Sequence, residues 1–171
     1  MSTTRFNTTE SLNANVNLNK VRANTWFDYT LDKNTEWVKE LILELNENAH
    51  ELTDHEKIDQ SFLELDLKLK KDFKGSTGDY LLCDLVVTAE FNTLCVKTGT
   101  PMKDSLDFEV KMCFLPDHLA QTEAFLDQTE HFTDGEIYEL YYLNKNSEAP
   151  LKDAIHEQLF LNLNFYPSID N

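Results

Sequence analysis

Apolar and polar side chains alternate strictly across most of residues 62–115, and this pattern restricts the chain to few architectures. Between residues 62 and 73, leucine occupies four alternate positions, and charged residues fill the positions between them. The same period of two recurs over residues 80–94 and again over residues 104–115. Because successive side chains of a strand point to opposite faces, each segment is predicted to be a strand with one buried face.

Short connections join these three predicted strands. Gly75 and Gly78 mark a turn after the first strand, and residues 96–101 link the second strand to the third. Strands joined this closely pair as antiparallel hairpins. The sequence therefore predicts a three-stranded meander with one face in water.

Two segments with a helical period flank the meander. Residues 35–45 carry apolar side chains at helical spacing behind a cap at Asn34 or Thr35, and residues 150–163 do so behind Pro150. Residues 16–30 and 135–143 indicate further strands, and residues 117–130 indicate a short helix or an acidic loop. The predicted fold class is α+β: an antiparallel sheet with a meander or hairpin core, open or barrel-like. One helix from the N-terminal half and one C-terminal helix would pack on it.

The remaining segments indicate how the domain is delimited. Residues 1–15 are rich in Ser, Thr and Asn with little to bury, which predicts a flexible tail. Residues 16–171 have the length of one domain with its own core. Within that domain, residues 144–150 are typical of a polar linker.

Composition argues against several classes of function. No apolar run approaches the roughly 20 residues that a membrane-spanning helix needs, and the start of the chain lacks the apolar core of a secretory signal. The 3 cysteines stand in no close-spaced framework, which indicates reduced thiols. The 4 glycines form no phosphate-binding pattern. We therefore expect a cytoplasmic protein with no nucleotide cofactor and no membrane association.

The residues that could act in catalysis or bind a metal do not form a recognisable motif in the sequence. No HExxH or CxxC pair suggests a zinc site, and no serine or cysteine stands in a nucleophile motif. With 31 acidic residues in the chain, carboxylate pairs carry no information. The sequence predicts no enzyme activity, no metal, no cofactor and no small-molecule substrate. The histidines considered are His50, His55, His118, His131 and His156.

The chain is strongly acidic, with 15 basic against 31 acidic residues and a net charge of −16. Such a surface repels nucleic acid over most of its area. Any contact with RNA would depend on the basic stretch of residues 67–74 and on one further lysine; alternatively, these lysines keep the sheet soluble and its edge unpaired. The candidate binding residues are expected to lie on or beside the wet face of the sheet, and they are Lys68, Lys70, Lys71, Lys74 and Lys97.

The connection at residues 94–101 and the terminal segment at residues 155–167 carry a resemblance to a known family. Their order and spacing resemble the YceD-like family of bacteria and plastids, the large ribosomal RNA subunit accumulation proteins, over about residues 16–170. That family has a Cys-x-Arg-Cys turn and a closing helix of the type Glu-x-Leu-x-Leu-x-Leu-Pro. The residues matched to the turn are Cys95, Lys97 in place of arginine, Thr98 in place of the second cysteine, Gly99 and Pro101.

The helix motif is matched by Glu157, Leu159, Leu161 and Leu163, with Asn164 in place of its proline. Loss of the second cysteine means that a metal or redox role of the pair would not carry over to this chain. The resemblance implies a role in large-subunit ribosomal RNA accumulation or processing and in subunit assembly. The implied partner is a large-subunit RNA precursor or a basic ribosomal protein. If the partner is a basic ribosomal protein, the acidic C-terminal third of the chain would shield it before it docks.

A different class of protein fits the composition as well. An acidic cytoplasmic binding module, similar to an immunity or adaptor protein, would neutralise a basic protein partner without any connection to ribosomes. Both hypotheses describe a protein that binds and does not catalyse, and they differ in the identity of the partner.

Overall fold

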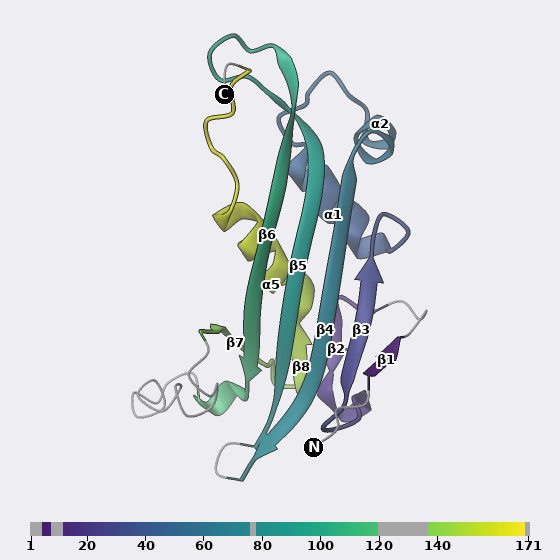
Figure 1. The fold of residues 1–171 in the computed structure, drawn as a ribbon, viewed down its shortest axis with the longest axis vertical. Helices are drawn as coiled ribbons and strands as arrows, with labels where there is room; N and C mark the ends of the chain where they lie inside the picture. The colour runs from purple at the N-terminus through teal and green to yellow at the C-terminus, as the bar shows by residue number, and fades with distance from the viewer. Residues whose placement is uncertain (1–4, 8–11, 76–77, 120–136, 170–171) are drawn as a thin grey trace.

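The computed structural model describes residues 5–7, 12–75, 78–119 and 137–169 (Figure 1). Among these residues, no helix is long and apolar enough to cross a membrane. The helices are α1 (Glu36–Leu45), α2 (Asp54–Asp59) and α5 (Leu151–Leu161). The strands are β1 (Arg5–Asn7), β2 (Asn15–Asn17), β3 (Trp26–Leu31), β4 (Phe62–Lys74), β5 (Gly78–Leu94), β6 (Pro101–Leu115), β7 (Glu139–Tyr142) and β8 (Glu148–Pro150).

The predicted meander forms the centre of the main sheet. Strands β4, β5 and β6 pair as antiparallel neighbours along nearly their whole lengths and make a long, twisted ribbon (Figure 1). The described strands of this sheet follow the order β1-β3-β4-β5-β6-β7, with β1 and β7 joined in parallel at its two edges. The α+β class and the antiparallel meander are confirmed. The sheet remains open and does not close into a barrel.

Helices α1 and α5 cover one face of this sheet, as predicted, and the other face carries no α-helix in the described part of the chain (Figure 1). On the covered face, the alternating leucines of β4 and the facing residues of β5 pack beneath the apolar sides of the two helices. An ion pair between Glu40 and Lys152 joins α1 to α5. Trp37 of α1 donates its Nε1–H to the Leu12 carbonyl, at 2.8 Å. We call this covered side the inner face and the opposite side the outer face.

Three segments differ from their prediction. Within the predicted flexible tail, Arg5–Asn7 form β1 against β3, and Leu12 is buried in the main core. Residues 148–150, predicted as linker, form β8 and pair with β2. Helix α2 was not predicted, although Thr53 and Glu56 form a capping box at its start. Of residues 117–130, Asp117–Leu119 form one short helical turn, and residues 120–130 lie outside the described part.

One end of the outer face is apolar. Tyr80, Cys113 and Leu115 are buried there in a second cluster, separate from the main core. Strand β7 forms one side of this cluster through Leu140 and Tyr142. The rest of the outer face is polar, so the prediction of one wet face holds for most of the sheet but not for this end.

Candidate partner-binding face

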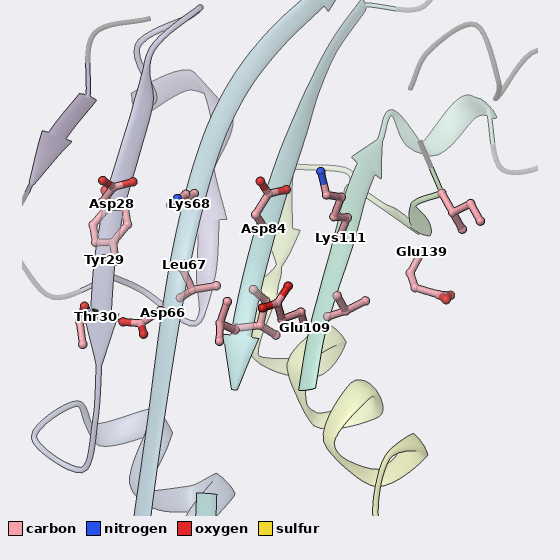
Figure 2. Close-up of a pocket in the computed structure, with 14 residues that line it drawn as sticks. Asp28, Tyr29, Thr30, Asp66, Leu67, Lys68, Asp84, Glu109, Lys111 and Glu139 are labelled. Atoms are coloured by element: carbon pink, nitrogen blue, oxygen red, sulfur yellow. Dashed lines mark hydrogen bonds between the residues drawn. The ribbon is translucent and has the colours of Figure 1, made fainter. Parts of the chain in front are cut away.

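Four charged side chains of alternating sign cross the outer face in one row. The strand register places Asp28 of β3 opposite Lys68 of β4, Lys68 opposite Asp84 of β5, and Asp84 opposite Lys111 of β6. Figure 2 shows the four residues at one level across the sheet. Opposite charges on directly facing positions stabilise neighbouring strands. Each lysine of the row therefore has an acidic residue facing it from a neighbouring strand.

The next row has no lysine to balance its acids. It runs from Thr30 through Asp66 and Val86 to Glu109, again by direct register. The Thr30 hydroxyl donates a hydrogen bond of 2.8 Å to the Asp66 carboxylate, whereas Val86 and Glu109 project from the centre of the sheet into solvent. The two rows together leave an excess of negative charge on the middle of the outer face.

The twist of the sheet makes this part of the outer face concave. The hollow has a volume of about 910 Å³ and is bordered on the β7 side by Ile137 and Glu139. Its lining includes 5 acidic residues and 2 lysines, a net charge of −3. One oxygen of Asp28 is buried and accepts no hydrogen bond from the described residues. The hollow therefore presents a net negative charge, which suits a cationic ligand.

The structure does not gather the five predicted binding lysines into a basic patch. Lys68 lies between two acids in the charged row, and Lys70 has its Nζ 3.7 Å from an Asp72 carboxylate oxygen. The Nζ of Lys70 also lies 5.8 Å from the centroid of the Trp26 ring, a cation–π distance. These two lysines are on the outer face, as predicted, but within a surface of net negative charge.

Lys71 is on the inner face, which corrects the prediction that it lies on or beside the wet face. Its ammonium donates a hydrogen bond of 2.9 Å to the Leu18 carbonyl and lies 3.5 Å from a carboxylate oxygen of Asp79. Its side chain is only 14% exposed. The role of Lys71 is to hold the chain before β3 against β4, and it has little surface left for a partner.

Lys74 and Lys97 lie at opposite ends of the long sheet. Lys74 ends β4 beside the β4–β5 turn, while Lys97 occupies the β5–β6 connection at the other end (Figure 1). Lys74 and Lys97 therefore do not form one basic patch with Lys68. The candidate site that the structure supports consists of acids instead, namely Asp28, Asp66, Asp84, Glu109 and Glu139.

The turn that carries the family resemblance is tightly built around Cys95. The Cys95 N–H donates to the Thr100 carbonyl at 2.9 Å, and the Gly99 N–H donates to the Cys95 carbonyl at 2.7 Å. Gly99 has a φ of 69°, in the left-handed region that favours glycine. Thr98, which the resemblance matches to the second cysteine of the turn, has its hydroxyl 2.8 Å from the Thr100 hydroxyl and beside the Cys95 thiol. The turn is thus closed by hydrogen bonds among Cys95, Thr98, Gly99 and Thr100.

We expect Cys95 to ionise far below the other two thiols. Hydrogen bonds, first from the Thr98 hydroxyl and then from backbone N–H groups, lower the pKa of Cys95 to about 6. Burial raises the pKa of Cys113 to about 12 and that of Cys83 still further. Ultraviolet thiolate absorbance of the folded protein should therefore show a single ionisation near pH 6, and Thr98→Val should shift it upward. Absence of this ionisation in the wild type, or its persistence in Cys95→Ser, would contradict the assignment.

This ionisation also predicts a pH dependence of stability. The pKa of Cys95 in the folded chain lies below the ordinary thiol value of 9.0. The contribution of Cys95 to the free energy of unfolding therefore grows as the pH rises from about 6 towards 9, and it is lost as the pH falls through 6. Urea denaturation of wild type and Cys95→Ser across this range measures the contribution.

The histidines offer no metal site within the described residues. His50, His55 and His118 are exposed, and His156 pairs with Glu44 between the two helices; His131 lies outside the described part. Across that part of the chain, no group of three or more His, Cys, Asp or Glu side chains has a metal-binding arrangement. No protein-family model, curated protein or solved structure matches the chain.

Proposed function

We propose that this protein is a cytoplasmic, non-enzymatic assembly factor of the large ribosomal subunit that binds a basic ribosomal protein through the outer face of its sheet. The observation that carries the proposal is the acidic hollow formed by the two rows of side chains. A basic segment lying there would find carboxylates at hydrogen-bond reach from four neighbouring strands. By holding such a segment before it docks on RNA, the factor would support accumulation of the large-subunit RNA.

The distribution of charge favours a protein partner over direct contact with RNA. Binding to nucleic acid requires several lysines or arginines facing phosphates together. Here the net charge is −16, and the lysines of the outer face stand among acids. A phosphate chain on this face would meet more carboxylates than ammonium groups. The same face attracts and orients a basic protein, and electrostatic complementarity of this kind speeds association.

The connection to ribosomes rests on the resemblance at residues 94–101 and 155–167, and sedimentation of a lysate tests it. We expect the protein to co-migrate with large-subunit precursors at low salt and to dissociate as the salt concentration rises, because the attraction is electrostatic. Mild nuclease treatment should leave the protein bound to a basic ribosomal protein. Migration as free protein at every salt concentration would contradict the assembly role.

The acidic face would serve an adaptor or immunity-like module equally well, since it selects basic charge and not a particular protein. Capture on the immobilised protein separates the two functions. Recovery of large-subunit ribosomal proteins supports the proposal, whereas recovery of one non-ribosomal basic protein with no ribosomal protein would replace it with the adaptor function.

A further inference from the structure

Most of the edge of strand β6 that faces away from β5 has no strand paired with it among the described residues. The strand is 15 residues long, and its neighbour β7 pairs with it only along Met112–Leu115. Along residues 102–110, the described part of the chain provides no backbone hydrogen bond to the side opposite β5. An edge strand of this length presents a row of unpaired N–H and C=O groups, to which another extended chain can add.

The side chains along this edge differ between the two faces. Lys103, Ser105, Asp107 and Glu109 point to the outer face and are exposed. Lys103 is paired with Glu90 of β5, with its Nζ 3.3 Å from a carboxylate oxygen, so the two acids set the charge of the rest of this edge. Phe108 and Val110 point to the inner face, where they are half-buried and pack against the main core. Pairing with β5 runs in one unbroken register from Pro101 to Phe114, so no bulge twists the edge away from an approaching strand.

We propose that β6 accepts an added strand from the partner, a segment in which lysine or arginine alternates with apolar residues. The inference rests on the proposed function, because it takes the partner to be basic. The basic side chains of the added strand would lie beside Asp107 and Glu109, continuing the outer face. Its apolar side chains would cover Phe108 and Val110 on the inner face. Main-chain hydrogen bonds would then add affinity to the charge attraction of the hollow.

The charge of the β6 edge also distinguishes between the chains that could pair with it. A second copy of the chain would bring a net charge of −16 against another −16. The segment of residues 120–136 carries 5 acidic residues and no lysine or arginine, so it has no charge complementarity to the edge. A basic, extended partner segment is the occupant that matches both faces of β6.

A pair of N-methylated peptides tests the added strand. The probe is a capped nonapeptide of alternating lysine and valine, prepared unmodified, N-methylated on every lysine, or N-methylated on every valine. In a strand, the lysine and valine N–H groups point to opposite edges. We expect one methylated isomer to bind like the parent and the other to bind about 100-fold more weakly, because it loses its hydrogen bonds to β6. Amide exchange should show protection of alternate amides within residues 102–110 on binding.

Other outcomes would overturn the added strand. Equal binding of both methylated isomers without protection of the amides of residues 102–110 would mean that side chains alone hold the peptide. Absence of binding by the parent peptide would remove the edge as a site for such segments. Amides of residues 102–110 already protected in dilute free protein would mean that the chain covers its own edge. Protection that appears only with rising concentration would assign the edge to a second copy. Ribosomal co-sedimentation is measured without these peptides, so the proposed function stands or falls separately.

Discussion

Replacing Asp66 and Glu109 together by lysine is expected to weaken binding of a basic peptide about 100-fold while leaving the fold intact. Both side chains are exposed. They belong to the acidic row, in which Val86 of β5 lies between Asp66 of β4 and Glu109 of β6. Each reversal turns an attraction into a repulsion, which we take as about 1.4 kcal/mol, or tenfold, per position. Calorimetric titration with an octalysine peptide at low salt measures the loss, and the difference should shrink as salt is added.

A matched control separates the outer face from the net charge of the protein. Glu47 and Glu51 are exposed at the end of α1 and in the segment after it, away from the hollow. Replacing both by lysine changes the net charge from −16 to −12, the same change as in the test variant. This control should bind the peptide within about twofold of wild type, since screened charges act over roughly 10 Å. Equal loss in both variants would mean that the attraction is diffuse and that the hollow is not the site.

Replacing Phe114 by alanine is expected to lower the free energy of unfolding by about 3–5 kcal/mol. Phe114 is fully buried on β6, and its ring stacks on Tyr141 of β7 with the centroids 5.4 Å apart. Truncation would remove this contact between β6 and β7 and leave a cavity in the main core. Domains of this size have total stabilities of about 5–15 kcal/mol, so the loss is a large share of the whole. Urea denaturation monitored by circular dichroism measures it.

Phe73 provides the control for this substitution. It lies near the end of β4 and is 62% exposed, so Phe73→Ala should change the free energy of unfolding by no more than about 0.5 kcal/mol. Similar losses for the two variants would contradict the placement of Phe114 in the core. A loss confined to Phe114→Ala supports the burial of Phe114 in the main core.

The local parts of the fold could be predicted from the sequence because their signals lie within each segment. The period of two over residues 62–115 predicted β4, β5 and β6, and the helical period predicted α1 and α5. The pairing of β1 with β3 and of β2 with β8 could not be predicted in this way. Strands β1, β2 and β8 are three residues long and have no periodic pattern of their own. Strands β2 and β8 also lie more than 100 residues apart in the sequence. Such short strands form because the surrounding core positions them.

The candidate site was harder to predict from the sequence than the fold, because it depends on the register between strands. The sequence shows lysines in residues 67–74 but not that Asp28 and Asp84 face Lys68 from the neighbouring strands. One signal was present for Lys71: it has the same parity as the inward leucines of β4, which predicts the inner face. The acids of β3, β5 and β6 have the parity of the outer face in the same way. Their assembly into one hollow required the observed register and twist.

The hollow and the β6 edge form one continuous surface. Glu109 belongs to the acidic row and also stands on the open edge of β6. A partner strand added to β6 would therefore carry its basic side chains along the border of the hollow. We expect affinity to combine backbone pairing with charge, so that Asp66→Lys with Glu109→Lys also weakens the alternating Lys–Val peptide.

Photocrosslinking from the centre of the outer face is the most direct test of the proposed function. Val86 is 39% exposed between Asp66 and Glu109, and a benzoylphenylalanine there would lie within the hollow. In living cells, the protein labelled at residue 86 should crosslink to a basic large-subunit ribosomal protein, and the same label at Glu47 should not. Crosslinks from residue 86 to RNA alone, or to a non-ribosomal protein alone, would contradict the proposal that this face holds a ribosomal protein during subunit assembly.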